Sequence, residues 1–147
     1  MKRLFTQLLG RAAEPEASED DLHLAAAALL YEVARADGGV APEERDLLLA
    51  RLARRWTLPR DQVVEKFNAA EEAAERATDY FQFTRPLREH WSVQERIELI
   101  QDMWAVAHAD GRADPHEEYV IRKVADLLYV AHSDFIQARH STRQGDT

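Results

Sequence analysis

A twelve-residue pattern that occurs twice constrains the fold of this chain more than any other feature. It runs from Val33 to Glu44 and again from Val106 to Glu117, 73 positions later, with Val, Ala, Ala, Asp, Gly, Pro and Glu at matching places. An internal repeat indicates one structural unit that is used twice. We therefore expect two similar halves, and a site built in one copy should have a counterpart across a pseudo-twofold axis.

The spacing of apolar residues indicates helices along almost the whole chain. From Ser18 onward, apolar side chains recur every three or four positions, as in helices that bury one face. Helices are expected to begin near Ser18, Pro42, Pro59, Asp79, Ser92, Asp114 and Ser133. Ser92 and Glu95 have the spacing of a capping box, Gly38 suits a helix stop, and Pro86 sets a bend or an end in the fourth helix. No stretch alternates with the period of two that strands need, so no sheet is expected. The predicted fold is all-α, a single domain of about seven helices in two pseudo-symmetric halves.

The length of 147 residues suits one domain. We assign residues 20–140 to the helical domain, residues 1–19 to an N-terminal tail or short helix with a linker, and residues 141–147 to a frayed C-terminus. The first ten residues carry Leu and Phe at helical spacing beside Lys2 and Arg3. This segment is either a frayed tail or a helix resting on the core, or else an anchor for a membrane or a partner. It is the only candidate for direct membrane contact.

Composition narrows the class of protein. Nineteen Lys and Arg against 27 Asp and Glu give a formal net charge of -8, which repels phosphate backbones and disfavours nucleic acid as a partner. The chain has no cysteine, which removes disulfides, thiolate metal sites and cysteine nucleophiles, and is compatible with a reducing compartment. No apolar run approaches the roughly 18 residues of a membrane span, and no signal-peptide pattern is convincing. We expect a cytoplasmic protein.

The repeated connections carry carboxylates at fixed places. Asp37 and Glu44 flank one tight helix–helix connection, and Asp110 and Glu117 flank the other. Ca²⁺ and Mg²⁺ bind carboxylates and exposed carbonyl oxygens, and both are expected at a helix C-terminus of this kind. The same residues also suit ordinary helix capping, since acids in a first turn favour the helix dipole. The spacing alone leaves cation binding and capping both open.

Several motifs resemble the TerB-like tellurite-resistance family over roughly residues 20 to 140. They are the two Ala-Asp-Gly loops, Pro-Glu-Glu at 42–44, Tyr-Phe-Gln-Phe-Thr-Arg at 80–85, Glu-Tyr-Val-Ile-Arg-Lys-Val-Ala at 118–125 and Ser-Asp-Phe-Ile at 133–136. The resemblance implies an all-helical domain of two pseudo-symmetric halves, related to the N-terminal domain of membrane-anchored DnaJ-like co-chaperones. It also implies a metal site, which maps onto Asp37, Glu44, Asp110 and Glu117, and a context of stress response and tellurite resistance.

Other groups of polar or aromatic residues have simpler interpretations. His108, His116 and His132 are interpreted as surface residues rather than a transition-metal site. Glu95, Glu98 and Asp102 are interpreted as a solvated helix face rather than part of a di-iron centre, because no Glu-x-x-His motif accompanies them. The larger aromatic residues are interpreted as core and inter-helix packing: Trp56, Tyr80, Phe81, Phe83, Trp91 and Trp104.

The sequence therefore favours a non-enzymatic helical module. It would bind a divalent cation (Ca²⁺, Mg²⁺ or another metal) at its two acidic connections and contact protein partners. Two alternatives remain open at this point. One is a metal-dependent hydrolase that uses the same carboxylates, although the sequence offers no evident nucleophile or base. The other is a metal-free structural adaptor whose loops only cap helices.

Overall fold

The computed structural model describes residues 18–36, 38–109 and 113–145, the last three without their side chains. These residues form one all-helical domain, and no strand occurs among them, so the predicted fold class is confirmed. The helices are α2 (Glu19–Ala34), α3 (Pro42–Trp56), α4 (Arg60–Arg76), α5 (Phe81–His90), α6 (Val93–Ala107), α7 (Pro115–Leu127) and α8 (His132–Gly145). The boundaries predicted for the tail, the domain and the C-terminus stay predictions.

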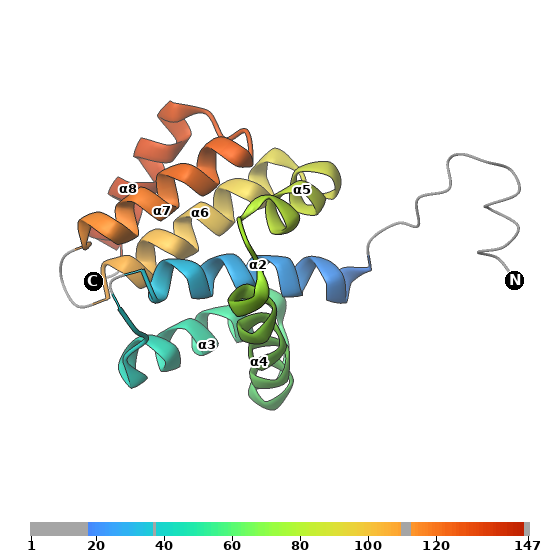
Figure 1. Cartoon of the computed structure of the whole chain (residues 1–147). Coiled ribbons are helices and arrows are strands. Elements are labelled where there is room, and N and C mark those ends of the chain that lie inside the picture. Colours follow the sequence, from blue (N-terminus) through green and yellow to red (C-terminus); the bar gives the residue numbers. More distant parts are fainter. Residues whose placement is uncertain (1–17, 37, 110–112, 146–147) are drawn as a thin grey trace, which may run out of the picture.

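Helices α2 and α6 form the centre of the domain, and their packing partners occupy equivalent places in the chain. In Figure 1, α3 and α4 lie on one side of α2, and α5 to α8 lie on the other. Helix α2 packs most extensively against α4, and α6 packs most extensively against α8. The chain is thus two three-helix halves, α2–α4 and α6–α8, with α5 joining them.

Both central helices begin with the same cap. The Ser18 Oγ accepts a hydrogen bond from the Asp21 amide at 3.1 Å, and the Asp21 carboxylate accepts one from the Ser18 amide at 3.2 Å. Ser92 and Glu95 form the same reciprocal pair at the start of α6, at 3.1 and 2.9 Å. Each capping box satisfies two amides that have no partner within the helix. The predicted helix starts at Ser18 and Ser92 are therefore confirmed.

The repeat extends beyond the segment that the sequence shows. Helices α3 and α7 both carry Pro at their first position and are both followed by a left-handed residue, Thr57 (φ 54°) and Tyr129 (φ 60°). The amide of the next residue then donates to a carbonyl five positions back in each half, at 3.1 and 2.9 Å. Such a bond uses a carbonyl that the helix end leaves unpaired. The next helix begins after this turn in each half: α4 follows α3, and α8 follows α7.

Equivalent side chains also meet in both halves. Tyr31 of α2 lies edge-on to Phe67 of α4 with ring centroids 6.0 Å apart, and Trp104 of α6 meets Phe135 of α8 at 5.4 Å. An ion pair joins α3 to α4 through Arg45 and Glu71 at 3.2 Å. The second half joins α7 to α8 through Glu118 and Arg139 at 3.0 Å. Glu118 stands 73 positions after Arg45, and Arg139 stands 68 after Glu71, as Phe135 does after Phe67. The two halves thus use one ion pair with its charges exchanged.

The core explains why α2 is so rich in alanine. Residues 25–30 are all buried, so this helix is covered on every side. Small side chains at Ala25 to Ala28 let neighbouring helices approach closely, while Leu29 and Leu30 fill the space between them. The sequence pattern predicts a wide apolar stripe, and the structure shows that the middle of α2, residues 25–31, is in fact buried all round.

Three predictions for α5 can be compared with the structure. The helix continues through Pro86 to His90, so the proline does not end it. The Asp79 Oδ1 accepts a hydrogen bond from the Phe81 amide at 2.9 Å, as expected for a residue that starts this helix. Phe81 itself is 45% exposed, so the prediction that it packs in the core is wrong. Its ring instead lies 6.0 Å from the Arg88 guanidinium on the surface of the same helix.

Candidate functional site

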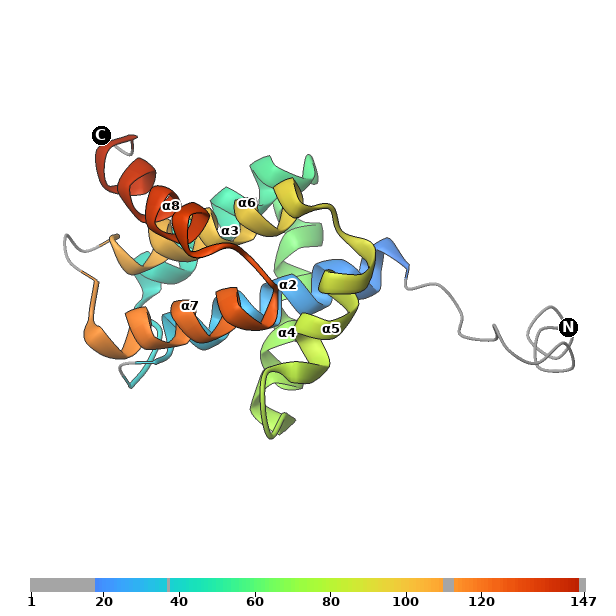
Figure 2. The ribbon, with the colours of Figure 1, turned by 90° about the horizontal axis from the view of Figure 1, so that it is seen from above.

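The two repeated connections lie at the same end of the domain. Helices α2 and α6 run in the same direction in both views, so their C-terminal ends, at Ala34 and Ala107, face the same side (Figures 1 and 2). The N-terminal ends of α3 and α7 lie on that side as well. Asp37 and Asp110, two of the four predicted metal ligands, are outside the described residues. The other two, Glu44 and Glu117, can be placed.

Glu44 and Glu117 occupy equivalent positions and make the same bond. The Glu44 Oε1 accepts a hydrogen bond from the Ala41 amide at 3.0 Å, and the Glu117 Oε1 accepts one from the Asp114 amide, also at 3.0 Å. Each glutamate is therefore the third residue of its helix and closes the helix start. Glu117 is buried, whereas Glu44 is partly exposed. The capping interpretation holds for both glutamates.

Gly38 has a φ of 123°, the left-handed backbone expected of a helix stop. Gly111 is outside the described residues. Among the residues that can be placed, no three His, Asp or Glu side chains are grouped so that they could hold a metal ion. Asp37 and Asp110 lie outside these residues, so the predicted four-residue site stays a prediction.

His108, His116 and His132, three of the histidines of the second half, have separate surroundings. The His108 ring stacks on Trp104 with centroids 5.4 Å apart. His116 pairs with Asp114, the N-cap of its own helix, at 3.1 Å. His132 stacks on Phe135 at 6.0 Å. Each of these side chains thus has a contact with a different neighbour within the second half.

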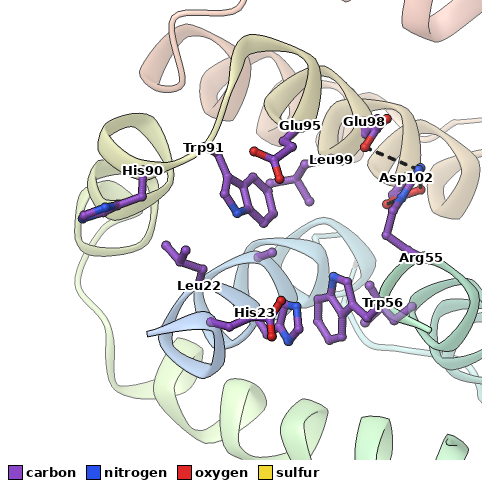
Figure 3. A pocket seen from close by; sticks show the side chains of 13 residues that line it. Leu22, His23, Arg55, Trp56, His90, Trp91, Glu95, Glu98, Leu99 and Asp102 are labelled. Atoms are coloured by element: carbon purple, nitrogen blue, oxygen red, sulfur yellow. Dashed lines mark hydrogen bonds and ion pairs between the residues drawn. The ribbon is translucent and has the colours of Figure 1, made fainter. Parts of the chain in front are cut away.

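A cavity of about 450 Å³ lies toward the opposite end of the domain, beside the starts of α2 and α6. Figure 3 shows its walls: α2 below, the end of α3 at one side, and α6 with the α5–α6 connection above. The lining contains two tryptophans, two histidines, four carboxylates and one guanidinium among apolar residues. They are Glu19, Leu22, His23, Ala26, Leu52, Arg55, Trp56, His90, Trp91, Glu95, Glu98, Leu99 and Asp102.

Asp102 forms one wall of the cavity and is not on a solvated face, so that prediction is wrong. Its side chain is only 4% exposed. The Arg51 Nε donates to the Asp102 Oδ1 at 2.7 Å, and Arg55 donates to both oxygens, at 2.8 and 3.1 Å. Both arginines come from α3, so this cluster ties α3 to α6. The hydrogen bonds to Asp102 raise the pKa of the Arg55 guanidinium and keep it charged. Glu98 adds a longer contact to Arg55 at 3.7 Å.

His23 forms the floor of the cavity. Its ring stacks on the Trp56 indole with centroids 3.9 Å apart and planes 14° from parallel. The Lys66 Nζ lies 3.2 Å from its Nδ1 and also pairs with Asp20. Burial lowers the pKa of the His23 imidazole, and the nearby ammonium of Lys66 lowers it further. The ring is therefore held neutral in the pH range where an exposed histidine begins to take up a proton.

A second hollow, of about 550 Å³, lies between α2, α5 and α7. Its lining includes the Arg35 and Glu32 pair, Tyr80 and the exposed ring of Tyr119. Burial raises the pKa of the Tyr80 hydroxyl, with the Glu32 carboxylate as a further cause. Acidic and basic residues balance each other within this lining, so its net charge favours neither a cationic nor an anionic ligand.

The sequence offered one signal for the first cavity. His23 interrupts an otherwise apolar run at the start of α2. A polar ring at that place is either a satisfied core residue or part of a site, and the sequence alone does not decide. The placement of Trp56 and Trp91 on different walls of the cavity depends on contacts between helices that the local pattern does not contain.

These features define a class of all-helical domain built from two similar three-helix halves, each with its acidic connection at the same end. The family model described as "Tellurite resistance protein TerB" matches residues 23–140, and the chain belongs to this family. No curated protein and no solved structure matches the chain. None of the described helices is both long and apolar enough to cross a membrane.

Proposed function

We propose that this protein is a non-enzymatic TerB module that binds a divalent cation at its two acidic connections and contacts protein partners in a stress or tellurite-resistance context. The ligands would be Asp37 and Glu44 in one half and Asp110 and Glu117 in the other. One observation supports the proposal most strongly. Glu44 and Glu117 are fixed by the same backbone bond, in equivalent helices, at the same end of the domain.

The chemistry of the connections agrees with a hard cation. Ca²⁺ takes six to eight oxygen ligands from carboxylates, carbonyls and water, and Mg²⁺ takes six. Each connection follows a helix C-terminus, where the last carbonyls carry partial negative charge. A carboxylate has about four lone-pair sites, so a capping bond to the backbone and a contact with a cation do not exclude one another.

The experiment compares the chelator-treated full-length protein with the double variant Asp37→Asn, Asp110→Asn. Calorimetric titration with CaCl₂, MgCl₂, MnCl₂ and ZnCl₂ should give heat for the unsubstituted chain and none for this double variant. A cation at 100 times its Kd should also stabilise the fold by about 2.7 kcal/mol. The double variant Asp61→Asn, Asp126→Asn removes two exposed carboxylates elsewhere and should bind as the parent does.

The cation proposal would be refuted if the titrations gave no heat and the cations did not shift the melting temperature. The metal-free adaptor would then remain, with Glu44 and Glu117 acting only as helix caps. A control variant that binds as weakly as the loop variant would show that net charge, and not the connections, attracts the cation.

A further inference from the structure

We propose that the cavity between α2, the end of α3 and α6 is a binding site for a small organic cation, an ammonium group carried on an apolar body. Two partly exposed indoles, Trp91 above and Trp56 below, lie on different walls of the cavity, and carboxylates are part of its lining (Figure 3). The site is separate from the acidic connections and goes beyond the cation binding proposed for them.

The aromatic walls come from two different helix ends. Trp56 is the last residue of α3, and Trp91 follows α5 directly. Both are half-buried, so each leaves part of its ring toward the cavity. One face of Trp56 is already covered by His23 at 3.9 Å. Indole faces attract cations through the negative face of the ring, and tryptophan does so most strongly.

The charge of the lining favours the same ligand. Four carboxylates face one guanidinium, and that guanidinium, Arg55, is committed to Asp102 through two hydrogen bonds. Three further carboxylates line the cavity: Glu19, Glu95 and Glu98. Glu95 also caps α6, and Glu98 lies 3.7 Å from Arg55, so Asp102 is the only one of the four that two hydrogen bonds from Arg55 neutralise. The neutral His23 ring adds no positive charge, because burial lowers the pKa of its imidazole.

The N-terminal ends of α2 and α6 oppose the binding of a cation only weakly. A helix N-terminus has about half a positive charge, which would favour an anion. Both N-termini, however, carry acids in their first turn, three of them in α2 (Glu19 to Asp21) and Glu95 in α6. An anionic ligand would therefore meet more carboxylate charge than helix dipole. The volume of about 450 Å³ falls within the range of ordinary small-molecule sites.

The test uses three probes of nearly equal size on the full-length protein in buffer with EDTA: 2-phenylethylammonium, 2-phenylethanol and phenylacetate. Binding is followed by tryptophan fluorescence and by the indole N–H signals in NMR spectra. The signals of Trp56 and Trp91 should shift saturably with the ammonium probe. Trp104 is fully buried and does not line the cavity, so its signal serves as an internal reference. The ammonium should bind at least about tenfold more tightly than the alcohol, and phenylacetate should bind most weakly.

Two variants test the named walls. Trp91→Leu should weaken ammonium binding about tenfold, and Glu98→Gln should weaken it severalfold while leaving binding of the alcohol unchanged. Tyr119→Leu and Glu72→Gln change an exposed ring and an exposed carboxylate outside the cavity and should bind as the parent does.

The proposal is overturned if the alcohol or phenylacetate binds as tightly as the ammonium, or if no probe shifts Trp56 or Trp91. The proposal also fails if Glu98→Gln leaves the affinity for the ammonium unchanged. This result can be interpreted even if Trp91→Leu does not fold. The double variant Asp37→Asn, Asp110→Asn should keep ammonium binding. Failure at the acidic connections and failure at this cavity are thus separate outcomes.

Discussion

Among the ion pairs of the described residues, loss of the Asp102 carboxylate should destabilise the domain more than loss of any other single charge. Its side chain is 4% exposed and accepts three hydrogen bonds from Arg51 and Arg55. Breaking a buried ion pair from one side costs about 3–5 kcal/mol, because the remaining charge is left without its partner. The two arginines here are 20% and 32% exposed, so water can restore part of their solvation. We therefore expect Asp102→Ala to lower the free energy of unfolding by about 3 kcal/mol.

Chemical denaturation measures this change, and a thermal scan should show the melting temperature about 10 °C lower for a chain of this size. The control is Asp46→Ala, which breaks an Asp–Arg pair of similar length, 3.0 Å to Arg60, but with the carboxylate 73% exposed. This control should cost less than about 1 kcal/mol. A double-mutant cycle with Arg51→Met should give a coupling energy of about 1–2 kcal/mol. Equal losses for the two aspartates, or no coupling, would refute the argument that burial makes the Asp102 cluster important.

Two further predictions concern pH and backbone strain. Because the folded chain lowers the pKa of His23, the unfolded chain takes up this proton first as the pH falls below about 6.5. The free energy of unfolding should therefore be highest above this pH and fall toward pH 5. His23→Phe, which keeps a ring on Trp56, should make the fall shallower, and equal slopes in urea titrations would contradict the assignment. Thr57→Gly should stabilise the domain by about 0.5–1 kcal/mol, since a β-branched residue is strained at a φ of 54°. Tyr129→Gly should gain less, because Tyr129 lies 4.7 Å from the Arg88 guanidinium and this contact would be lost. If Thr57→Gly lowers the denaturation midpoint, the argument that the Thr57 backbone is strained is wrong.

The sequence predicted the features that depend on neighbouring residues. The capping boxes at Ser18 and Ser92 need only residues three positions apart, and the proline at position 42 or 115 marks a helix start by itself. The repeat predicted two halves because equal local sequences form equal local structures. These contacts are all within one turn or one connection, so periodicity and spacing contain the required information.

The sequence could not show which polar residues are buried. Asp102 shares one helix with Glu95 and Glu98, and the three acids are equivalent by pattern. Only the packing of α3 against α6 brings Arg51 and Arg55 to Asp102, across about fifty positions of sequence. A buried charge of this kind is stable only with such partners. Its burial therefore follows from a contact between helices, which no local pattern records.

The two ends of the domain differ in how they arise from the repeat. At the end with the acidic connections, α3 and α7 begin with the same cap, so this feature is present in both halves. The cavity at the other end takes His90 and Trp91 from the end of α5 and the connection that follows it, and α5 joins the halves without being part of the repeated three-helix unit. The cavity therefore has no second copy among the described residues, although α2 and α6 start with equivalent caps. Substitutions in α5 can then change the cavity while Glu44 and Glu117 keep their caps, because these hydrogen bonds lie at the starts of α3 and α7 themselves. The duplicated caps and the single cavity can thus change independently within one small domain.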